Sequence, residues 1–304
     1  MKIKREKNQI GTGIVKESFF CYMTLTILTI LCVVPLLLVI SASVTSEESI
    51  VKYGYSLIPR DFSLNTYKYL LTSKLKMFMK AYGVTIAVTV LGTLFSVSVT
   101  ACFAWAVTQN KEVFRPTRFL SFYAWFTTIF SGGILSWYIL CTQYYGLKNN
   151  IFALFIPYGM SVWNMFILRG AFRGVSTELI ESAQLDGASN ALIFRKIVLP
   201  LARAGIVTVI MFDMLKFWND FHLSQWLITD SDYYTLQKLL YNMLTSTMFL
   251  LQNSQGSNLS VNMTVPAETS KMAVAVLAIL PIIMIYPFSL RYFVKGINLG
   301  GVKG

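Results

Sequence analysis

Charged residues are scarce in this 304-residue chain: they make up 13% of it, about half of the roughly 25% found in an average soluble domain. An intrinsically disordered chain is excluded, because disorder combines low hydrophobicity with high charge. Four cysteines are too few for a disulfide scaffold, and no two of them form a C-x-x-C pair. His222 is the only histidine, which excludes a site built from several histidines. No G-x-x-x-x-G-K-[S/T] phosphate-binding loop occurs, so the sequence predicts no ATPase of its own.

Apolar residues, by contrast, make up 55% of the chain, and its mean hydropathy is +0.58. A membrane-spanning helix needs about 20 predominantly apolar residues. The sequence therefore predicts an all-α, polytopic membrane protein with six transmembrane helices in a single domain over 1–304. The predicted spans are Phe19–Ile40, Ala81–Thr108, Phe119–Cys141, Ile151–Leu168, Leu199–Trp226 and Met272–Leu290.

Basic residues are unevenly distributed between the predicted loops. The net charge is +12, but no nucleic-acid-binding motif accompanies it, so no nucleic acid is expected as a partner. With the N-terminus in the cytoplasm, the cytoplasmic segments hold sixteen Lys and Arg residues and the external segments nine. Because cytoplasmic loops are enriched in Lys and Arg, both termini are predicted to be cytoplasmic. The cytoplasmic segments are then 1–18, 109–118, 169–203 and 291–304.

The third of these segments carries the most informative pattern, STELIESAQLDGASNALIFRKIVLP over 176–200. Ser176 or Thr177 can cap a helix, and Glu178 follows near its positive end. Gly187 permits a sharp turn, after which a second helical stretch is expected up to Val198. Pro200 can begin the next membrane helix, because the N–H that it lacks has no partner there. The segment therefore reads as a helix–turn–helix at the membrane surface, with a rigid exit through Pro200.

The spacing within 176–200 resembles a known signature. Glu181, Ala183, Gly187 and the Ile197-Val198-Leu199-Pro200 run fit E-A-A-x(2–3)-G-x(9)-I-x-L-P, with Ser182 at the second position of the pattern, where alanine is usual. This is the signature of permease subunits of bacterial ABC importers. Phe130-Ser131-Gly132-Gly133, Leu168-Arg169, Trp218-Asn219 and the ending YPFSLRYFVKGINLGGVKG resemble MalG-like carbohydrate permeases of the lipoprotein-operon branch, which is found mainly in Gram-positive bacteria.

The resemblance implies a type I ABC importer permease fold, with ATP binding carried out by a separate partner chain. The hairpin would be a coupling helix seated in a groove of a homodimeric cytoplasmic ATPase, which would bind ATP and magnesium in place of this chain. The residues expected to couple to the ATPase are Glu181, Ser182, Ala183, Asp186, Gly187, Ile197, Leu199 and Pro200. A second, homologous permease, an extracellular binding lipoprotein and an oligosaccharide are the other expected partners, in the plasma membrane of a bacterium. The external segments 43–80 and 223–271 would receive the lipoprotein, and the C-terminal tail Gly296–Gly304 would also contact the ATPase or remain a basic end without a partner.

Polar residues inside the predicted spans are candidates for the substrate path. Ionisable groups in a membrane are costly, so they are usually paired or functional. Asp213 and Lys216 are three residues apart and share a helix face, either as a self-neutralising pair or as part of the sugar pathway. The other candidates are Asn164, Trp218, Asn219 and Asp220. Trp218 could stack on a sugar or belong to the aromatic belt at the membrane interface.

Two other functions compete with the carbohydrate importer. A stand-alone secondary carrier would explain the spans and the Asp213–Lys216 pair, but it would not explain the hairpin spacing. An ABC importer for a non-sugar solute would share every feature of the hairpin. An enzyme is not expected, because the lone His222 forms no recognisable nucleophile–histidine pair and the sequence offers no metal-binding cluster.

Overall fold

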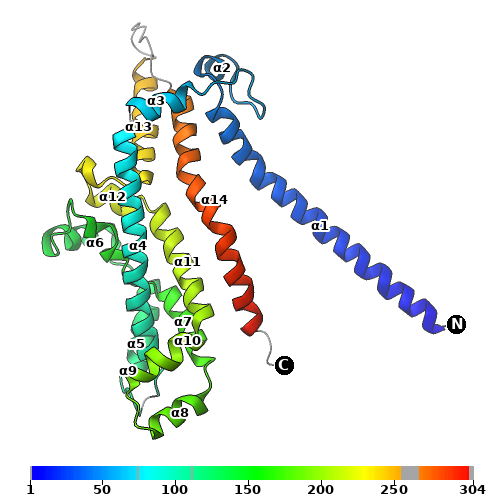
Figure 1. Ribbon diagram of the computed structural model, residues 1–304, viewed down its shortest axis with the longest axis vertical. Helices are drawn as coiled ribbons and strands as arrows, with labels where there is room; N and C mark the ends of the chain where they lie inside the picture. The colour runs from blue at the N-terminus through cyan, green and yellow to red at the C-terminus, as the bar shows by residue number, and fades with distance from the viewer. Residues whose placement is uncertain (1, 74, 111, 255–266, 301–304) are drawn as a thin grey trace. The chain divides into compact units, whose positions relative to one another are not determined.

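In the computed structural model, residues 2–73, 75–110, 112–254 and 267–300 are described, and their regular structure is helical (Figure 1). A single isolated bridge between Thr45 and Phe62 is the one strand-like pairing in these ranges. The prediction of an all-α protein is confirmed. The chain divides into two units, one formed by Met1–Lys74 with Ser246–Leu277 and the other by Leu75–Thr245 with Ala278–Gly304.

The first unit begins with α1 (Lys2–Ser43), whose apolar part is long enough to cross a membrane. The candidate span is Phe19–Ser43, and its 25 residues rise about 37 Å as a helix, more than the roughly 30 Å of a bilayer core. None of its most apolar stretch is buried in the molecule. The hydroxyls of Thr24, Thr26 and Thr29 donate to carbonyls four residues earlier, so their polar groups are satisfied within the helix. The first predicted span is therefore confirmed as a helix with an apolar surface open to lipid or to another chain.

Two short helices follow α1 in the same unit. The side chain of Ser46 caps α2 (Glu47–Tyr53), which ends at Gly54 with a φ of +74°. The chain then forms α3 (Asn65–Ser73), with Leu70 buried on its inner face. The segment between these helices returns to the end of α1, where the Ser41 hydroxyl donates to the Ser56 carbonyl at 2.8 Å. It also pairs with the link after α1, because the Ser46 N–H donates to the carbonyl of Asp61 and the Ser63 N–H to that of Val44. The segment 43–73, part of the predicted external segment 43–80, is thus folded by helices and hydrogen bonds and is not an irregular connection.

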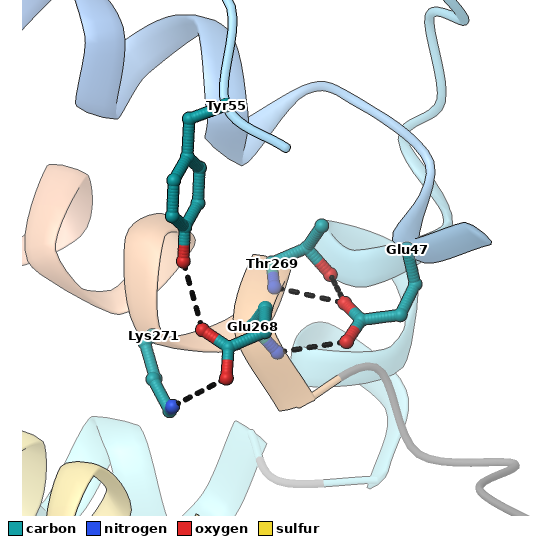
Figure 2. Close-up of polar contacts among 5 residues, drawn as sticks. All are labelled: Glu47, Tyr55, Glu268, Thr269 and Lys271. Carbon is teal, nitrogen blue, oxygen red and sulfur yellow. Dashed lines mark hydrogen bonds and ion pairs between the residues drawn. The ribbon is translucent and has the colours of Figure 1, made fainter. Parts of the chain in front are cut away.

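Glu47 also caps a helix far away in the sequence, α14 (Ala267–Gly300). Figure 2 shows its carboxylate at the first turn of α14, where it accepts hydrogen bonds from the backbone N–H groups of Glu268 and Thr269 at 2.8 and 2.9 Å. The Thr269 hydroxyl donates to the same carboxylate at 2.7 Å. Glu268 in turn accepts hydrogen bonds from Tyr55 and Lys271, each at 2.8 Å. A carboxylate at a helix N-terminus satisfies unpaired N–H groups and complements the helix dipole. The first unit is therefore held together by a polar network around the start of α14.

The second unit is built on three helices: α4 (Leu75–Ala106), α7 (Val162–Arg173) and α11 (Arg203–Asn219). α4 and α11 approach closely at Gly92, where a Cβ would lie 2.9 Å from the Phe217 ring. α7 and α11 approach closely at Gly205, where a Cβ would lie 2.5 Å from that of Ala171. Small residues at such crossings let membrane helices pack with their backbones close together.

Three predicted spans are not continuous helices, which corrects the predictions for Phe119–Cys141, Ile151–Leu168 and Leu199–Trp226. The first is α5 (Thr117–Ile129) followed by a helical stretch over Gly133–Tyr144 bent by 115°, and it includes α6 (Gly133–Ile139). The second is a pair of 3₁₀ turns over Ile151–Tyr158 followed by α7 at 56°. The third bends by 81° at residue 202, before α11. Among the described residues, two unbroken helices could span a membrane, or up to five if each bent pair counts as one span.

Local chemistry explains each break. Gly133 has a φ of +82°, a conformation that costs glycine little and other residues more. Pro157 lies inside the 3₁₀ turn Ile156–Tyr158 and cannot donate a backbone hydrogen bond. Pro200 lies in α10 (Leu199–Leu201), directly before the bend. The sixth predicted span, Met272–Leu290, lies within the long helix α14.

Two further helices follow α11 along the chain, and the second of them passes from the second unit into the first at residues 245–246. α12 (His222–Leu227) leads through a 3₁₀ turn over Ser231–Tyr233 to α13 (Leu236–Ser254). Asn149, at a φ of +54°, anchors this stretch, because its side-chain oxygen accepts the N–H groups of Thr229 and Asp230 at 2.7 and 3.1 Å. The end of the predicted C-terminal tail, residues 301–304, lies outside the described residues.

Candidate coupling hairpin and substrate path

The segment 176–200 folds as the predicted helix–turn–helix. α8 (Thr177–Leu185) ends where Gly187 adopts a φ of +80°. The Ala188 N–H donates to the Ala183 carbonyl at 2.9 Å and the Gly187 N–H to the Gln184 carbonyl at 3.0 Å. These two bonds form a Schellman motif, in which a glycine in the left-handed conformation closes the end of a helix. Gly187 therefore fixes the turn by its backbone conformation.

The second arm of the hairpin starts at Ser189, whose hydroxyl accepts the Leu192 N–H at 3.4 Å and caps α9 (Asn190–Ile193). A π-helical turn over Phe194–Val198 continues it. The Phe194 ring stacks on Trp105 at 5.7 Å and meets Phe172 edge-on at 5.9 Å. Such aromatic pairs contribute about 0.5–1.5 kcal/mol each beyond the area that they bury. The second arm is thus anchored to α4 and α7, whereas the first arm has no buried residue.

The first arm presents an acidic and apolar surface. Glu181, Ser182 and Asp186 are exposed, and Ala183 is half-buried. Leu185 is 90% exposed and Leu179 50% exposed. A fully exposed leucine at the tip of a hairpin is an unsatisfied apolar surface, and such surfaces mark contacts with other chains when they adjoin polar residues.

The remaining predicted coupling residues lie between the hairpin and α11. Ile197 and Leu199 pack against the core around Val198, and Pro200 is exposed. The rigid exit through Pro200 extends only to residue 202, where the chain bends by 81°. The hairpin is therefore connected to α11 by the short helix α10 and a bend at residue 202, and not by one continuous helix.

The structure brings Asn164 and Asp213 together. Asp213 is fully buried, and the Asn164 side-chain amide donates to its carboxylate at 2.9 Å. Lys216 is directed elsewhere: its ammonium donates to the Tyr158 carbonyl at 3.4 Å and lies 4.3 Å from the centre of the Tyr158 ring. In the described ranges no ion pair joins Asp213 to Lys216, so the proposed self-neutralising pair is not formed. Tyr158 was not singled out from the sequence, and the adjacent Pro157 was its only local signal.

The three other path candidates lie at the end of α11. Trp218 is buried, and its indole N–H donates to the Ala278 carbonyl at 3.2 Å. Asn219 is exposed, and its amide donates to the Leu215 carbonyl. The Asp220 carboxylate accepts the Leu223 N–H at 3.0 Å at the start of α12. Of these three side chains, Asn219 is the most accessible. Among the described residues, no group of three or more acidic, histidine or cysteine side chains could hold a metal ion.

Comparison with known proteins places this architecture in a family. The family described as "Binding-protein-dependent transport system inner membrane component" matches residues 98–299, which include the whole hairpin and α11. This chain belongs to that family. The expectation of an ABC importer permease, drawn from the hairpin spacing, is thereby confirmed.

Similar permeases with informative names come from Bacillus subtilis. The polygalacturonan/rhamnogalacturonan transport system permease protein YtcP is 33% identical over 93% of this chain and 96% of its own length. Protein LplC of the same bacterium is 32% identical over 90% of both chains. In a crystal structure of a bacterial ABC transporter involved in the import of the acidic polysaccharide alginate, one chain is 25% identical and superposes with a TM-score of 0.77. The alignment covers 91% of this permease and 96% of that chain.

Proposed function

We propose that this permease is the transmembrane subunit of an ATP-driven, binding-protein-dependent importer of oligosaccharides. The observation that carries the proposal is the hairpin: an exposed acidic and apolar first arm, closed by Gly187 and anchored by its second arm to α4 and α7. The names of its relatives supply the substrate class, since YtcP is named for polygalacturonan and rhamnogalacturonan transport.

In the proposed mechanism, a homodimeric cytoplasmic ATPase binds ATP and magnesium and grips the first arm. Glu181 pairs with a basic group of the ATPase, and Leu185 fills an apolar part of its groove. When the ATPase dimer closes, it moves the hairpin, whose second arm contacts α4 and α7 through the Phe194 ring, stacked on Trp105 and edge-on to Phe172. The movement is transmitted to α11 through the bend at residue 202, and α11 then shifts relative to α4. Alternation between these two packings opens the path first to one side of the membrane and then to the other.

The proposal includes six spans, with three of them broken, and both termini in the cytoplasm of a bacterium, expected to be Gram-positive. A second, homologous permease completes the path, and the apolar surface of α1 is available to lipid or to that chain. An extracellular binding lipoprotein delivers the oligosaccharide to the segments 43–80 and 223–271. Asn164, Asp213, Lys216, Trp218, Asn219 and Asp220 remain the candidates for polar residues near the path.

The test is to purify the tagged protein from its native membranes in mild detergent and to identify the chains that follow it by mass spectrometry. We expect a second permease, an ATPase and a lipoprotein. The variant Glu181→Arg should lose the ATPase but keep the second permease. The matched control is Glu112→Arg, which makes the same charge change at an exposed residue of another predicted cytoplasmic segment. Recovery of the chain alone or as a homodimer would instead favour a secondary carrier, and a lipoprotein specific for a non-sugar solute would correct the substrate.

A further inference from the structure

The break between α5 and α6 opens onto a cavity of about 660 Å³ in the second unit. Its volume is within the roughly 300–1,000 Å³ typical of small-molecule sites. Three aromatic side chains, Trp137, Tyr158 and Trp226, contribute to the lining together with His222, Ser131 and Ser136.

The sequence builds this cavity from three separate elements. On α6, Gly133, Ser136 and Trp137 have the i, i+3, i+4 spacing of one helix face, and Leu140, directly after α6, continues the series at i+7; all four line the cavity. On α12, His222 and Trp226 are four residues apart and also share a face. Tyr158, from the 3₁₀ turn before α7, completes the lining.

The two glycines beside the cavity have no close packing neighbour in the part of the chain that the structure describes. A Cβ added to Gly132 or Gly133 would meet no atom within 4 Å, whereas a packing glycine such as Gly92 would meet its neighbours at 2.9 Å. Gly133 is needed for its φ of +82°, and the Ser131 hydroxyl accepts its N–H at 3.3 Å. Irregular backbone at membrane depth is tolerated where it is buried in protein or lines a water-filled cavity. The 115° bend at this point is therefore the kind of break expected beside a solute path.

The lining has the chemistry of a carbohydrate site. A sugar ring has apolar C–H faces and a rim of hydroxyls, so it needs aromatic faces to lie on and hydrogen-bonding groups around them. Trp226 is 46% exposed, and Tyr138 holds its ring edge-on at 6.5 Å, so the indole is both accessible and fixed in orientation. His222 and the two serine hydroxyls supply polar partners, and none of the lining residues carries an acidic group, a lysine or an arginine.

Tyr158 connects this cavity to the polar residues of α11. Its ring lines the cavity, and its carbonyl accepts the Lys216 ammonium at 3.4 Å, with the same ammonium 4.3 Å from the ring centre. A shift of α11 relative to the turn at Tyr158 would therefore change the cavity wall directly. The cavity is thus mechanically linked to the helix that the coupling hairpin is proposed to move.

We propose that this cavity is a sugar-ring subsite on the translocation path, in which Trp226 and Trp137 stack on one ring of the oligosaccharide while Ser131, Ser136 and His222 bond its hydroxyls. The inference rests on the proposed function, because a sugar must pass through the permease for the subsite to act. It assigns to this subunit a direct role in holding the substrate, at residues distinct from the polar candidates of α11.

The test uses the complete importer, reconstituted in vesicles with saturating binding lipoprotein. The probes are galacturonate, galactose and glucose trisaccharides, and the readout is the amount of sugar delivered per ATP hydrolysed. Trp226→Leu keeps an apolar side chain but removes the aromatic face, and it should lower this ratio by about 3- to 10-fold, as expected for loss of one aromatic contact. Trp226→Phe should restore most of the ratio, and the rate of ATP hydrolysis should stay at the wild-type value. The matched control is Trp163→Leu, at an exposed tryptophan outside the cavity.

Each other outcome is decisive. If the wild-type importer delivers sugar and Trp226→Leu matches Trp163→Leu, the subsite is wrong and the proposed function stands. If Trp226→Leu and Trp226→Phe lose the second permease on purification, the cavity is an interface between subunits and not a sugar site. If transport and ATP hydrolysis fall together in both Trp226 variants, the residue has a structural role. If the wild-type importer delivers none of the three sugars, both the proposed oligosaccharide import and the sugar-ring subsite are contradicted.

Discussion

The amide of Asn164 donates to the carboxylate of Asp213 across 2.9 Å, joining α7 to α11 inside the second unit. Both residues are buried, and Asp213 has no exposed surface. A buried carboxylate that loses a hydrogen-bond partner leaves an unsatisfied group, whereas replacing both partners by apolar groups is nearly neutral. Single and double substitutions of Asn164 and Asp213 should therefore differ in their effect on stability.

We expect Asn164→Leu to lower the free energy of unfolding by about 1–2 kcal/mol, because it leaves Asp213 buried without its partner. The double variant Asn164→Leu with Asp213→Leu should recover most of that loss. Thermal unfolding of the purified protein in detergent measures both. A double variant that is less stable than Asn164→Leu alone would show that Asp213 is held by other groups.

The capping of α14 by Glu47 gives a second prediction. Glu47→Ala removes the acceptor of three hydrogen bonds at the first turn of α14 and should cost about 1–2 kcal/mol of stability. Amide hydrogen exchange at Glu268 and Thr269 should speed up in this variant. Glu48→Ala is the control, because Glu48 is exposed and follows Glu47 directly in α2. Equal effects from the two variants would contradict the capping role.

The same network predicts a dependence on pH. Burial of Glu268 acts to raise its pKa, but the hydrogen bonds from Lys271 and Tyr55 outweigh it, and the pKa is lowered from its usual 4.5. A lowered carboxyl pKa stabilises the folded state above the unfolded pKa, and this contribution is lost as the pH falls below about 4.5. The contribution of Glu268 to the thermal midpoint should thus stay constant from pH 6 to about 4.5 and decrease at lower pH, and Glu268→Gln should flatten this decrease.

Tyr55 predicts the opposite behaviour in alkali. Burial, and then the hydrogen bond to Glu268, raise its pKa from 10.0 to about 12. Because the folded state holds the proton more tightly, stability is complete below pH 10 and is lost as the pH rises towards 12. Absorbance titration of the sixteen tyrosines should show a late phase of phenol ionisation in the wild type, and Tyr55→Phe should lower the amplitude of this phase by one phenol.

Gly187 offers a test of the hairpin turn. A Cβ at this position would meet no atom within 4 Å, so any effect of a substitution comes from the φ of +80°. Asparagine tolerates the left-handed conformation better than β-branched residues do. Gly187→Asn should therefore keep the ATPase bound on purification, and Gly187→Val should lose most of it. Loss with both variants would mean that the space around Gly187, filled by a partner, matters more than its backbone.

The hairpin was predictable from the sequence because its signals are local. Ser176 and Gly187 act on the residues next to them, and the structure places a helix start and a left-handed turn at these positions. The expectation that Pro200 begins the next membrane helix was wrong, because Pro200 lies in α10 and α11 begins only at Arg203, after the bend. The sequence alone could not decide whether the spans are broken, because an apolar stretch has the same composition whether the helix is straight or bent. Gly133 and Pro157 were visible signals, but glycine and proline also occur in unbroken membrane helices.

Contacts between distant residues were beyond the sequence. Asn164 and Asp213 were each identified as polar residues in apolar segments, but 49 residues separate them and only the packing of α7 on α11 joins them. Glu47 lies 221 residues before Glu268, and nothing in its own segment indicates a helix to cap apart from its own. The cavity at Trp226 likewise depends on the 115° bend that brings α6 next to α12.

The proposed contact between the first arm of the hairpin and a cytoplasmic ATPase can be tested directly by photo-crosslinking from the tip of that arm. A benzophenone amino acid is placed at Leu185, which is 90% exposed, and in a second protein at Ile58, which is 79% exposed in the predicted external segment 43–80. After illumination of intact cells, we expect a covalent adduct with an ATPase from position 185 and none from position 58. An ATPase adduct absent from position 185, or formed equally from both positions, would contradict it.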